Sequence, residues 1–388
     1  MRVNQLALED FRNYTREQVE LLPGLNLVVG RNAQGKTNLL EAIHCLGGFG
    51  SPRASDAALV REGAERALLH AEVQRGERKV RIDLEIKPGR GTRALVNRSA
   101  VQGLRSLSEV AVCVFFDPDE LSLVKGSPDG RRRFLDDLVV KLRPARDSLR
   151  REFERVLKQR NALLKSAPRT SSPQVEQTLS VWDEALARAG AALAVARLEA
   201  LASLVPFARK RYESIAGSGR LDLSYVSDWL GPELAGEVVS QLAPADASVF
   251  EPALAAKIES VRPREIERGV TLVGPQRDDV SVVLEDSDQA LMLDARTYAS
   301  QGDQRTSALA LKLGEHDLLS EVLGDEPVLL LDDVFSELDP ERRAWLVDAV
   351  GDVDQAIVTS ADIDRVGDIR ARRVIDVVAG SARVRADG

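Results

Sequence analysis

One stretch of eight residues, Gly30 to Thr37, constrains the fold more than any other part of the sequence. It reads Gly-Arg-Asn-Ala-Gln-Gly-Lys-Thr and fits the phosphate-loop pattern G-x-x-x-x-G-K-[ST]. An apolar run over residues 25–29 precedes it, and helix-forming residues over 38–43 follow it. A buried strand, a glycine turn and a helix are the context in which this pattern binds phosphate. The sequence therefore predicts an α/β fold with a nucleotide-binding loop at the end of a strand.

The residue types in this loop predict how a nucleotide is held. Backbone N–H groups of the loop and of the first helical turn would point at the β-phosphate, where the helix dipole favours negative charge. Gly30 and Gly35 allow the backbone to approach closely. Lys36 would reach the β- and γ-phosphates, and the Thr37 hydroxyl would bind Mg²⁺. The nucleotide-binding candidates are Gly30, Arg31, Asn32, Ala33, Gln34, Gly35, Lys36, Thr37 and Asn38.

A second element of the same chemistry lies near the C-terminus. Four aliphatic residues over 328–331 end in Asp332 and Asp333, which is the pattern of a Walker B strand. Asp332 would join Thr37 as a ligand of the Mg²⁺ that bridges the phosphates. Asp333 would orient or deprotonate the attacking water, and because many such ATPases have the longer Glu there, we expect slow hydrolysis. An acid pair after a strand can also cap a helix, but the sequence over 336–339 has the spacing of a D-loop, which makes Asp339 a further nucleotide-binding candidate.

Ser300, Gln301 and Gly302 form the third motif. A serine and a glycine at the start of a helix make an anion site, although a serine N-cap is the ordinary alternative. The phosphate loop already supplies donors to its own nucleotide, so this second anion site is predicted to serve the nucleotide of a second copy. Ser300 is therefore a catalytic candidate that acts across a head-to-tail pair of subunits with two ATP molecules between them.

Together these motifs predict the mixed sheet and helices of an ATP-binding-cassette (ABC) ATPase head with an antiparallel β-subdomain. About 260 residues separate Lys36 from Ser300, and the middle of the chain is rich in Ala, Leu, Arg and Glu. We therefore expect a head split by an inserted helical arm domain. The expected boundaries are 1–125 for the N-terminal half of the head, 126–265 for the arm and 266–388 for the C-terminal half.

Periodicity gives the expected elements inside these parts. A strictly alternating strand over 80–86 should pair with residues 94–97 across a turn. Two long helices, over 131–165 with an interruption before Pro144 and over 175–215, should form an antiparallel hairpin around a Pro/Ser break at 166–173. A third helix is expected near 252–261, and strands are expected over 270–275 and 280–284.

At finer grain the chain resembles the RecF family of bacterial recombination-repair proteins over essentially its whole length. The matching stretches are residues 10–14 (DFRNY), 30–42, 116–121 (FDPDEL), 125–128 with 131–136, 274–279 (GPQRDD), 300–302 and 331–339 (LDDVFSELD). One departure is Gln276, where the family usually has His, so a titratable role at this position is in doubt.

The resemblance implies an ATP-dependent homodimer that grips duplex or gapped DNA, with slow DNA-stimulated ATP hydrolysis releasing it. It also implies action with RecR and RecO to promote RecA loading on single-stranded gaps, and binding to single-stranded/duplex junctions. Thr359 stands where transporter cassettes carry a switch histidine, and the resemblance implies that its hydroxyl contacts the γ-phosphate. Arg12 and Asn13 are further candidates for nucleotide contact.

Charge is uneven along the chain. The formal net charge is −8, yet residues 131–169 carry 13 Lys/Arg against 5 Asp/Glu. Lys and Arg on a helical ridge suit sequence-independent contacts with duplex phosphates, and the aromatic content of 4% argues against a base-stacking groove for single strands. Arg143, Arg146 and Arg150 recur at helical spacing and are the predicted contacts. A solvated helix face is the alternative.

Composition limits the remaining classes. We expect no membrane span, because no apolar run approaches about 20 residues, and the first residues have no signal-peptide pattern. Cys45 and Cys113 sit in apolar surroundings, which is typical of buried reduced thiols and predicts a cytoplasmic protein. With only three histidines, a zinc site is not expected. Two alternatives remain: a soluble ATP-binding-cassette subunit of a transporter, and an SMC-like scaffold whose ATP turnover is incidental.

Overall fold

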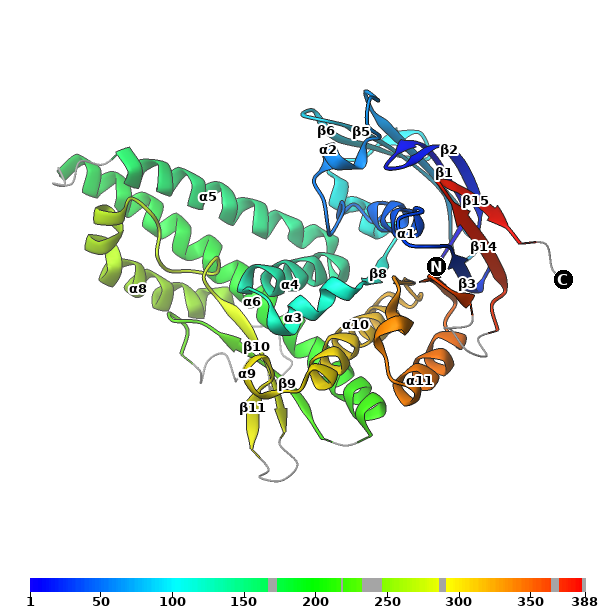
Figure 1. The fold of residues 1–388 in the computed structure, drawn as a ribbon. Coiled ribbons are helices and arrows are strands. Elements are labelled where there is room, and N and C mark those ends of the chain that lie inside the picture. The colour runs from blue at the N-terminus through cyan, green and yellow to red at the C-terminus, as the bar shows by residue number, and fades with distance from the viewer. Residues whose placement is uncertain (167–172, 218, 232–245, 286–290, 364–369, 386–388) are drawn as a thin grey trace. The chain divides into compact units, whose positions relative to one another are not determined.

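The computed structural model describes residues 1–166, 173–217, 219–231, 246–285, 291–363 and 370–385. It divides into two compact units (Figure 1). The head unit comprises residues 1–120, 214–217 and 309–388, and the arm unit comprises residues 121–213 and 218–308.

The first sheet of the head unit carries the phosphate loop. Its strand order is β15-β14-β3-β13-β12-β8, and β14, β3, β13, β12 and β8 run parallel while β15 is antiparallel to β14. The strand bounds are β3 (Gly24–Val29), β8 (Cys113–Phe116), β12 (Val328–Leu331), β13 (Gln355–Ser360), β14 (Arg373–Val378) and β15 (Ser381–Val384). Every residue of β8, β12 and β13 is buried, as expected for parallel strands covered on both faces.

The second sheet of the head unit is entirely antiparallel, with strand order β2-β1-β4-β5-β6-β7. Its strands are β1 (Arg2–Phe11), β2 (Tyr14–Glu20), β4 (Ala67–Arg75), β5 (Arg78–Lys87), β6 (Gly91–Val96) and β7 (Ser99–Ala100). In β5, Ile82, Leu84 and Ile86 point inward and their neighbours are more exposed, so the predicted alternation and the hairpin with β6 are confirmed. The fold thus has both predicted parts, a mixed sheet and an antiparallel subdomain.

The helices that lie wholly in the head unit are short. They are α1 (Lys36–Cys45), α2 (Asp56–Leu59), α11 (Pro340–Gly351) and the 3₁₀ turns η1 (Leu104–Glu109), η2 (Pro118–Leu121) and η4 (Val334–Glu337). Helix α10 (Gln301–Leu323) starts in the arm unit and continues in the head unit, and it begins directly after Ser300, where the third motif predicted a helix start. Helix α1 contacts β1 of the antiparallel sheet and β8, β12 and β13 of the parallel one, so it lies between the two sheets (Figure 1).

The arm unit is mainly helical, as predicted. Its helices are α3 (Ser122–Lys125), α4 (Pro128–Leu142), η3 (Pro144–Arg146), α5 (Asp147–Ser166), α6 (Pro173–Ala216), α8 (Ala247–Arg268) and α9 (Ala295–Tyr298). The predicted interruption before Pro144 is present, because Arg143 leaves the helical conformation there. Most of the predicted Pro/Ser break lies outside the described residues.

Helices α5 and α6 pack as an antiparallel pair. Phe153 of α5 lies against Gly190 of α6. Further along α5, Arg160 donates to Asp183 of α6 at 2.7 Å. The α5 partner thus moves forward along the chain as the α6 partner moves backward. Phe153 and Val156 join Leu186 and other α6 residues in the arm core, which α8 completes with its own apolar side chains.

A three-stranded sheet lies beside these helices in the arm unit, with order β11-β10-β9. It consists of β9 (Leu221–Val226), β10 (Asp279–Glu285) and β11 (Met292–Asp294), and β9 was not predicted. Since β10 pairs with β9 on one side and with β11 on the other, residues 266–308 group with the arm unit rather than with the C-terminal half of the head, to which the sequence analysis assigned them.

The strand predicted over 270–275 is wrong. In this segment the N–H of Thr271 donates to the side-chain oxygen of Asn161, and the N–H of Leu272 donates to Glu265. Side chains of α5 and α8 therefore satisfy the backbone that a neighbouring strand would otherwise bond.

By length and composition alone, one helix among the described residues is apolar enough to cross a membrane, which the sequence analysis did not anticipate. The stretch Glu176–Ala216 of α6 has a mean hydropathy of 1.6 over its most apolar window, and 72% of that window is buried inside the structure. Core helices of water-soluble folds can be equally long and apolar, and burial of this kind is typical of them.

Candidate nucleotide-binding site

The phosphate loop follows β3 at the edge where neighbouring parallel strands end. Val29 pairs with Ser360, the last residue of β13, and Leu331 at the end of β12 pairs with Val358. The edge therefore brings residues 30–37 and 332–333 together, around a cavity of about 520 Å³. The predicted nucleotide or catalytic residues that line it are Arg12, Asn32, Ala33, Gly35, Lys36, Thr37, Asn38, Asp332 and Asp333.

Gly35 has the conformation and the space that only glycine accepts. Its φ is 117°, and a Cβ there would meet the Asn13 amide at 2.7–2.8 Å. The hydroxyl of the buried Tyr14 donates to the Gly35 carbonyl at 2.9 Å. The N-terminus of α1 begins with the next residue and faces the cavity, which makes it an anion site.

Lys36 is 6% exposed and its ammonium group lies against the loop itself. It donates to the carbonyl of Gly30 at 2.6 Å and to that of Arg31 at 3.0 Å. Burial lowers the pKa of Lys36, while the carboxylates of Asp333 and Asp332 act in the opposite direction. The side chain thus supplies positive charge at the cavity wall.

Two oxygen ligands suited to Mg²⁺ converge beside it. The Thr37 hydroxyl lies 2.7 and 3.0 Å from the two carboxylate oxygens of Asp332. No cluster of three His, Cys, Asp or Glu side chains that could hold a metal occurs among the described residues. A single carboxylate and a hydroxyl fit Mg²⁺, which usually takes one or two carboxylates and completes its shell with waters and phosphate oxygens.

Thr359 does not line the cavity; it positions the acids. The side chain is fully buried, and its hydroxyl donates to Asp332 Oδ1 at 2.7 Å. The Thr359 hydroxyl oxygen also accepts the N–H of Asp333 at 2.9 Å. Asp333 has a left-handed backbone conformation, with φ 49°, and it lines the cavity. The predicted γ-phosphate contact of Thr359 therefore stays a prediction, while its hold on both acids is observed.

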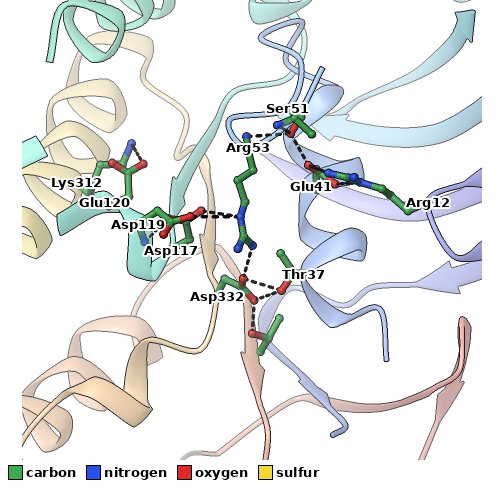
Figure 2. A network of polar contacts seen from close by, with 12 residues as sticks. Arg12, Thr37, Glu41, Ser51, Arg53, Asp117, Asp119, Glu120, Lys312 and Asp332 are labelled. Atoms are coloured by element: carbon green, nitrogen blue, oxygen red, sulfur yellow. Dashed lines mark hydrogen bonds and ion pairs between the residues drawn. The ribbon is translucent and has the colours of Figure 1, made fainter. Parts of the chain in front are cut away.

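The sequence analysis missed Arg53, which Figure 2 places at the centre of a polar network. Its Nη1 lies 3.4 Å from Asp332 Oδ2, and its Nε lies 3.7 Å from Asp117 and 3.6 Å from Asp119. Burial raises the pKa of Asp117 to about 6, and the neighbouring Glu120 adds to this. Arg53 ends the Gly-rich stretch 47–53, and its single signal in the sequence is a charged residue shortly after the phosphate-loop helix.

Arg12 lines the cavity, but its guanidinium is bound to protein groups. Nε and Nη2 each donate to the Glu41 carboxylate at 2.7 Å, and Nη1 donates to the carbonyl of Ala58 at 2.9 Å (Figure 2). The Ser51 hydroxyl also donates to Glu41. This network ties β1 and the loop after α1 to the phosphate-loop helix.

Asn13 supports the phosphate loop rather than lining the cavity. Its Nδ2 donates to the Gln34 carbonyl at 2.8 Å, and its Oδ1 accepts from Asn38 at 2.8 Å. Asp339, the D-loop candidate, is the N-cap of α11, where it accepts the N–H of Arg342 at 2.9 Å.

Ser300, Gln301 and Gly302 lie in the arm unit, whereas the residues lining the cavity belong to the head unit. Ser300 is exposed, its hydroxyl accepts the N–H of Asp303 at 3.2 Å, and it donates to the Asp303 carboxylate at 2.7 Å. This is a serine N-cap with a reciprocal acid, so the ordinary alternative is realised here. A role toward a second copy's nucleotide stays a prediction.

Gln276, the departure from the family pattern, also lies in the arm unit. Its Nε2 donates to the Val273 carbonyl at 2.9 Å, and its buried Oε1 has no hydrogen-bond partner among the described residues.

Several cations of the arm's basic cluster are paired with acids, and the predicted DNA contact along this part of the arm stays a prediction. Arg146 pairs with Glu199 at 2.6 Å, and Arg150 pairs with Glu154 at 2.6 Å. Arg160 is fully buried in the arm core, and Arg131 is buried and bonded to Asp279 at 2.7 Å. The sequence shows the charges but not these partners, several of which lie on other elements.

Comparison with known proteins gives one consistent result. The family model "RecF/RecN/SMC N terminal domain" matches residues 2–382. The "DNA replication and repair protein RecF" of Streptomyces avermitilis is 46% identical over 377 residues, covering 96% of each chain. The protein of the same name from Beutenbergia cavernae is 45% identical over 405 residues, covering 99% of this chain and all of the other.

Solved structures agree with this. That of the recombination mediator protein RecF-ATP in the RecFOR pathway is 26% identical, with a TM-score of 0.87 and coverage of 99% of this chain and 97% of the other. An Smc head bound to the C-winged helix domain of ScpA is 14% identical, covers 99% and 97%, and has a TM-score of 0.55, which shows the fold alone.

Proposed function

The chain belongs to the RecF family of DNA replication and repair proteins, and on that premise we propose that it is an ATP-dependent DNA-binding protein of recombinational repair. ATP closes a homodimer on duplex or gapped DNA, and slow, DNA-stimulated hydrolysis releases it. The observation that carries the proposal is the convergence of Lys36, Thr37 and Asp332 on one cavity, from segments about 300 residues apart. Family membership also removes the support for a transporter subunit.

The cavity residues divide the chemistry among them. Loop N–H groups and Lys36 hold the β- and γ-phosphates, and the protein supplies mainly positioning and electrostatic stabilisation. Thr37 and Asp332 hold Mg²⁺, which neutralises phosphate charge when bound. Asp333 orients the attacking water, and Thr359 fixes both acids. The cavity of about 520 Å³ is within the usual size of a small-molecule site.

The dimer completes the site in this proposal. Ser300, with Gln301 and Gly302, presents its hydroxyl and the start of α10 to the nucleotide of the second copy. Ser300 is exposed at the start of α10, which leaves its hydroxyl accessible to a second copy.

Several predicted arm cations are paired with acids, whereas Arg143 is exposed, so the arm stays one candidate for DNA contact and the antiparallel sheet of the head offers a second. Residues 75–98 carry eight Lys/Arg against three Asp/Glu, and Arg90, Arg93 and Arg98 are exposed on the β5-β6-β7 segment. We propose that this basic edge of the antiparallel sheet contacts duplex phosphates without reading sequence. Partners in the pathway are RecR, RecO and RecA, and the site of action is DNA gaps and junctions in the cytoplasm.

Sedimentation velocity with and without ATP and duplex DNA tests the proposal. Wild-type protein should shift from monomer to dimer on adding ATP with Mg²⁺, and Lys36→Met should not. Lys210→Met, which removes an exposed lysine of α6, is the matched control and should dimerise normally. Dimers of Lys36→Met at wild-type ATP concentrations would refute the scheme.

A further inference from the structure

The last two strands of the parallel sheet are joined by a two-residue turn, Ala379 and Gly380. Their φ angles are 47° and 75°, and two consecutive left-handed residues are typical of a tight hairpin turn of type I′. Such turns prefer Asn or Gly at the first position, so Ala379 holds a strained conformation. The turn lies beside β3 because β14 pairs with β3 in parallel as far as Asp376 and Val29 (Figure 1).

Both N–H groups of this turn bond one residue of the phosphate loop. The Ala379 N–H donates to Gln34 Oε1 at 2.7 Å, and the Gly380 N–H donates to the Gln34 carbonyl oxygen at 3.0 Å. The same carbonyl accepts from Asn13 Nδ2 at 2.8 Å. The main chain and the side chain of Gln34 are thus held from outside the loop.

Close backbone approaches accompany these bonds. A Cβ on Gly380 would lie 2.3 Å from the Asn13 carbonyl oxygen, and a Cβ on Gly30 would lie 2.3 Å from that of Val377. Ordinary contacts begin at 3.4 Å, so neither position accepts a side chain without backbone movement of about 1 Å. The hairpin therefore packs against both the start and the middle of the phosphate loop.

The peptide between Gln34 and Gly35 connects this contact to phosphate binding. A trans peptide is planar, and its carbonyl and N–H point in opposite directions. Because the Gln34 carbonyl points at Gly380 and Asn13, the Gly35 N–H points away from them, and Gly35 lines the cavity. A contact that fixes the orientation of the Gln34 carbonyl therefore also fixes the direction of the Gly35 N–H.

We infer that the Ala379–Gly380 turn and Gln34 are positioning residues of the nucleotide site, holding the Gly35 peptide so that its N–H faces the phosphates of ATP. The inference rests on the proposed nucleotide binding at the phosphate loop. It gives the C-terminal hairpin, which contains no nucleotide motif, a defined role in that binding. The phosphate common to ATP and ADP is the one such a donor would recognise.

Gly380→Ala tests the inference against Gly89→Ala. Gly89 has nearly the same φ, 72°, and also lies in a hairpin turn, but no atom lies within 4 Å of a Cβ there. Backbone strain is therefore matched, and only Gly380→Ala displaces Asn13. We expect Gly380→Ala to raise the Kd for both ATP and ADP by on the order of tenfold or more, measured by calorimetry on the full chain. Amide exchange in residues 30–37 should also become faster, while Gly89→Ala leaves both unchanged.

Gln34→Met provides a second variant if Gly380→Ala does not fold. It removes only the acceptor of the Ala379 N–H, so we expect a rise of about threefold in both Kd values, from loss of one weak hydrogen bond. ATP and ADP affinities equal to those of Gly89→Ala in every folded variant would overturn the inference. Lys36→Met distinguishes failure of the proposed function from failure of the positioning role. If Lys36→Met binds ATP like wild type, the proposed function fails. If only the hairpin variants bind ATP normally, the positioning role alone is refuted.

Discussion

Replacement of Arg160 by Met should unfold the arm unit far more readily than any exposed substitution. Arg160 is fully buried, with Nε 2.7 Å from Asp183, Nη2 2.6 Å from Glu265 and Nη1 2.8 Å from the Thr271 hydroxyl. Met replaces the aliphatic stem of Arg but lacks the guanidinium group, so it donates none of these bonds. The three groups converge from α6, α8 and the segment after α8, so the guanidinium joins three parts of the arm.

The expected magnitude follows from what the substitution leaves behind. Glu265 is also fully buried and would retain only the Leu272 N–H, at 2.6 Å, as a donor to its carboxylate. Removing one partner of a buried ion pair typically costs about 3–5 kcal/mol, because the remaining charge is uncompensated. Asp183 is less affected, since Arg262 bonds its second oxygen. Adding Glu265→Gln removes the orphan charge, and the double variant should lose only about 1–3 kcal/mol.

Tryptophan fluorescence in urea can measure this for the arm alone. Two of the three tryptophans, Trp182 and Trp229, lie in or against the arm core, and the third, Trp345, is in the head unit. A Trp345→Phe background therefore reports the arm unit. Arg155→Met, which breaks an exposed pair on α5, is the control and should change the midpoint little. A midpoint for Arg160→Met equal to that of the control would refute the reasoning.

Three further predictions concern charge. Burial raises the pKa of Asp278 to about 6, so the stability that its neutral form provides is complete below about pH 3.8 and is lost as pH rises through 6; the arm midpoint in urea should increase from pH 7 to 5 more in wild type than in Asp278→Asn, and equal increases would contradict this. Arg53→Ala removes a cation 3.4 Å from Asp332 and should lower severalfold the Mg²⁺ concentration for half-maximal ATP hydrolysis, whereas Arg53→Lys should not. Arg93→Gln with Arg98→Gln should weaken duplex binding and reduce its salt slope by up to about 2 in a fluorescence-anisotropy titration, and an unchanged slope would exclude the β-sheet edge.

The parts of the site that the sequence predicted share one physical basis. The phosphate loop and the Walker B acids each follow a short apolar run, and in a parallel sheet the carboxyl ends of such runs meet at one edge. The positions of these two runs in the sheet are therefore enough to predict that four residues meet at this edge: Lys36, Thr37, Asp332 and Asp333. The same logic predicted the β5–β6 hairpin and α10, whose periodicity is strong and local.

The errors arise where side chains on distant elements decide the outcome. The expected strand over 270–275 is apolar, but Asn161 and Glu265 bond its N–H groups, and these lie over 100 positions away and just before it, respectively. The DNA contact expected along the arm stays a prediction, but the sequence did not show that Arg146 pairs with Glu199 of α6. Secondary-structure propensity and hydrophobic periodicity depend on the local sequence, so they do not predict such partners on other elements.

Arg53 and the Ala379–Gly380 turn show that a phosphate-loop motif does not identify the residues that support the loop. A phosphate-loop motif specifies which residues bind phosphate, because glycine, lysine and threonine have intrinsic chemistry there. It does not specify what holds the loop in shape, since that role needs only a donor, an acceptor or a glycine at the right place in space. Arg53 reaches Asp332 from a loop after α1, and the hairpin turn reaches Gln34 from about 345 positions away. Supporting residues of this kind are therefore found by tracing the hydrogen bonds of each motif residue outward, and substitutions in them should affect nucleotide affinity although no motif contains them.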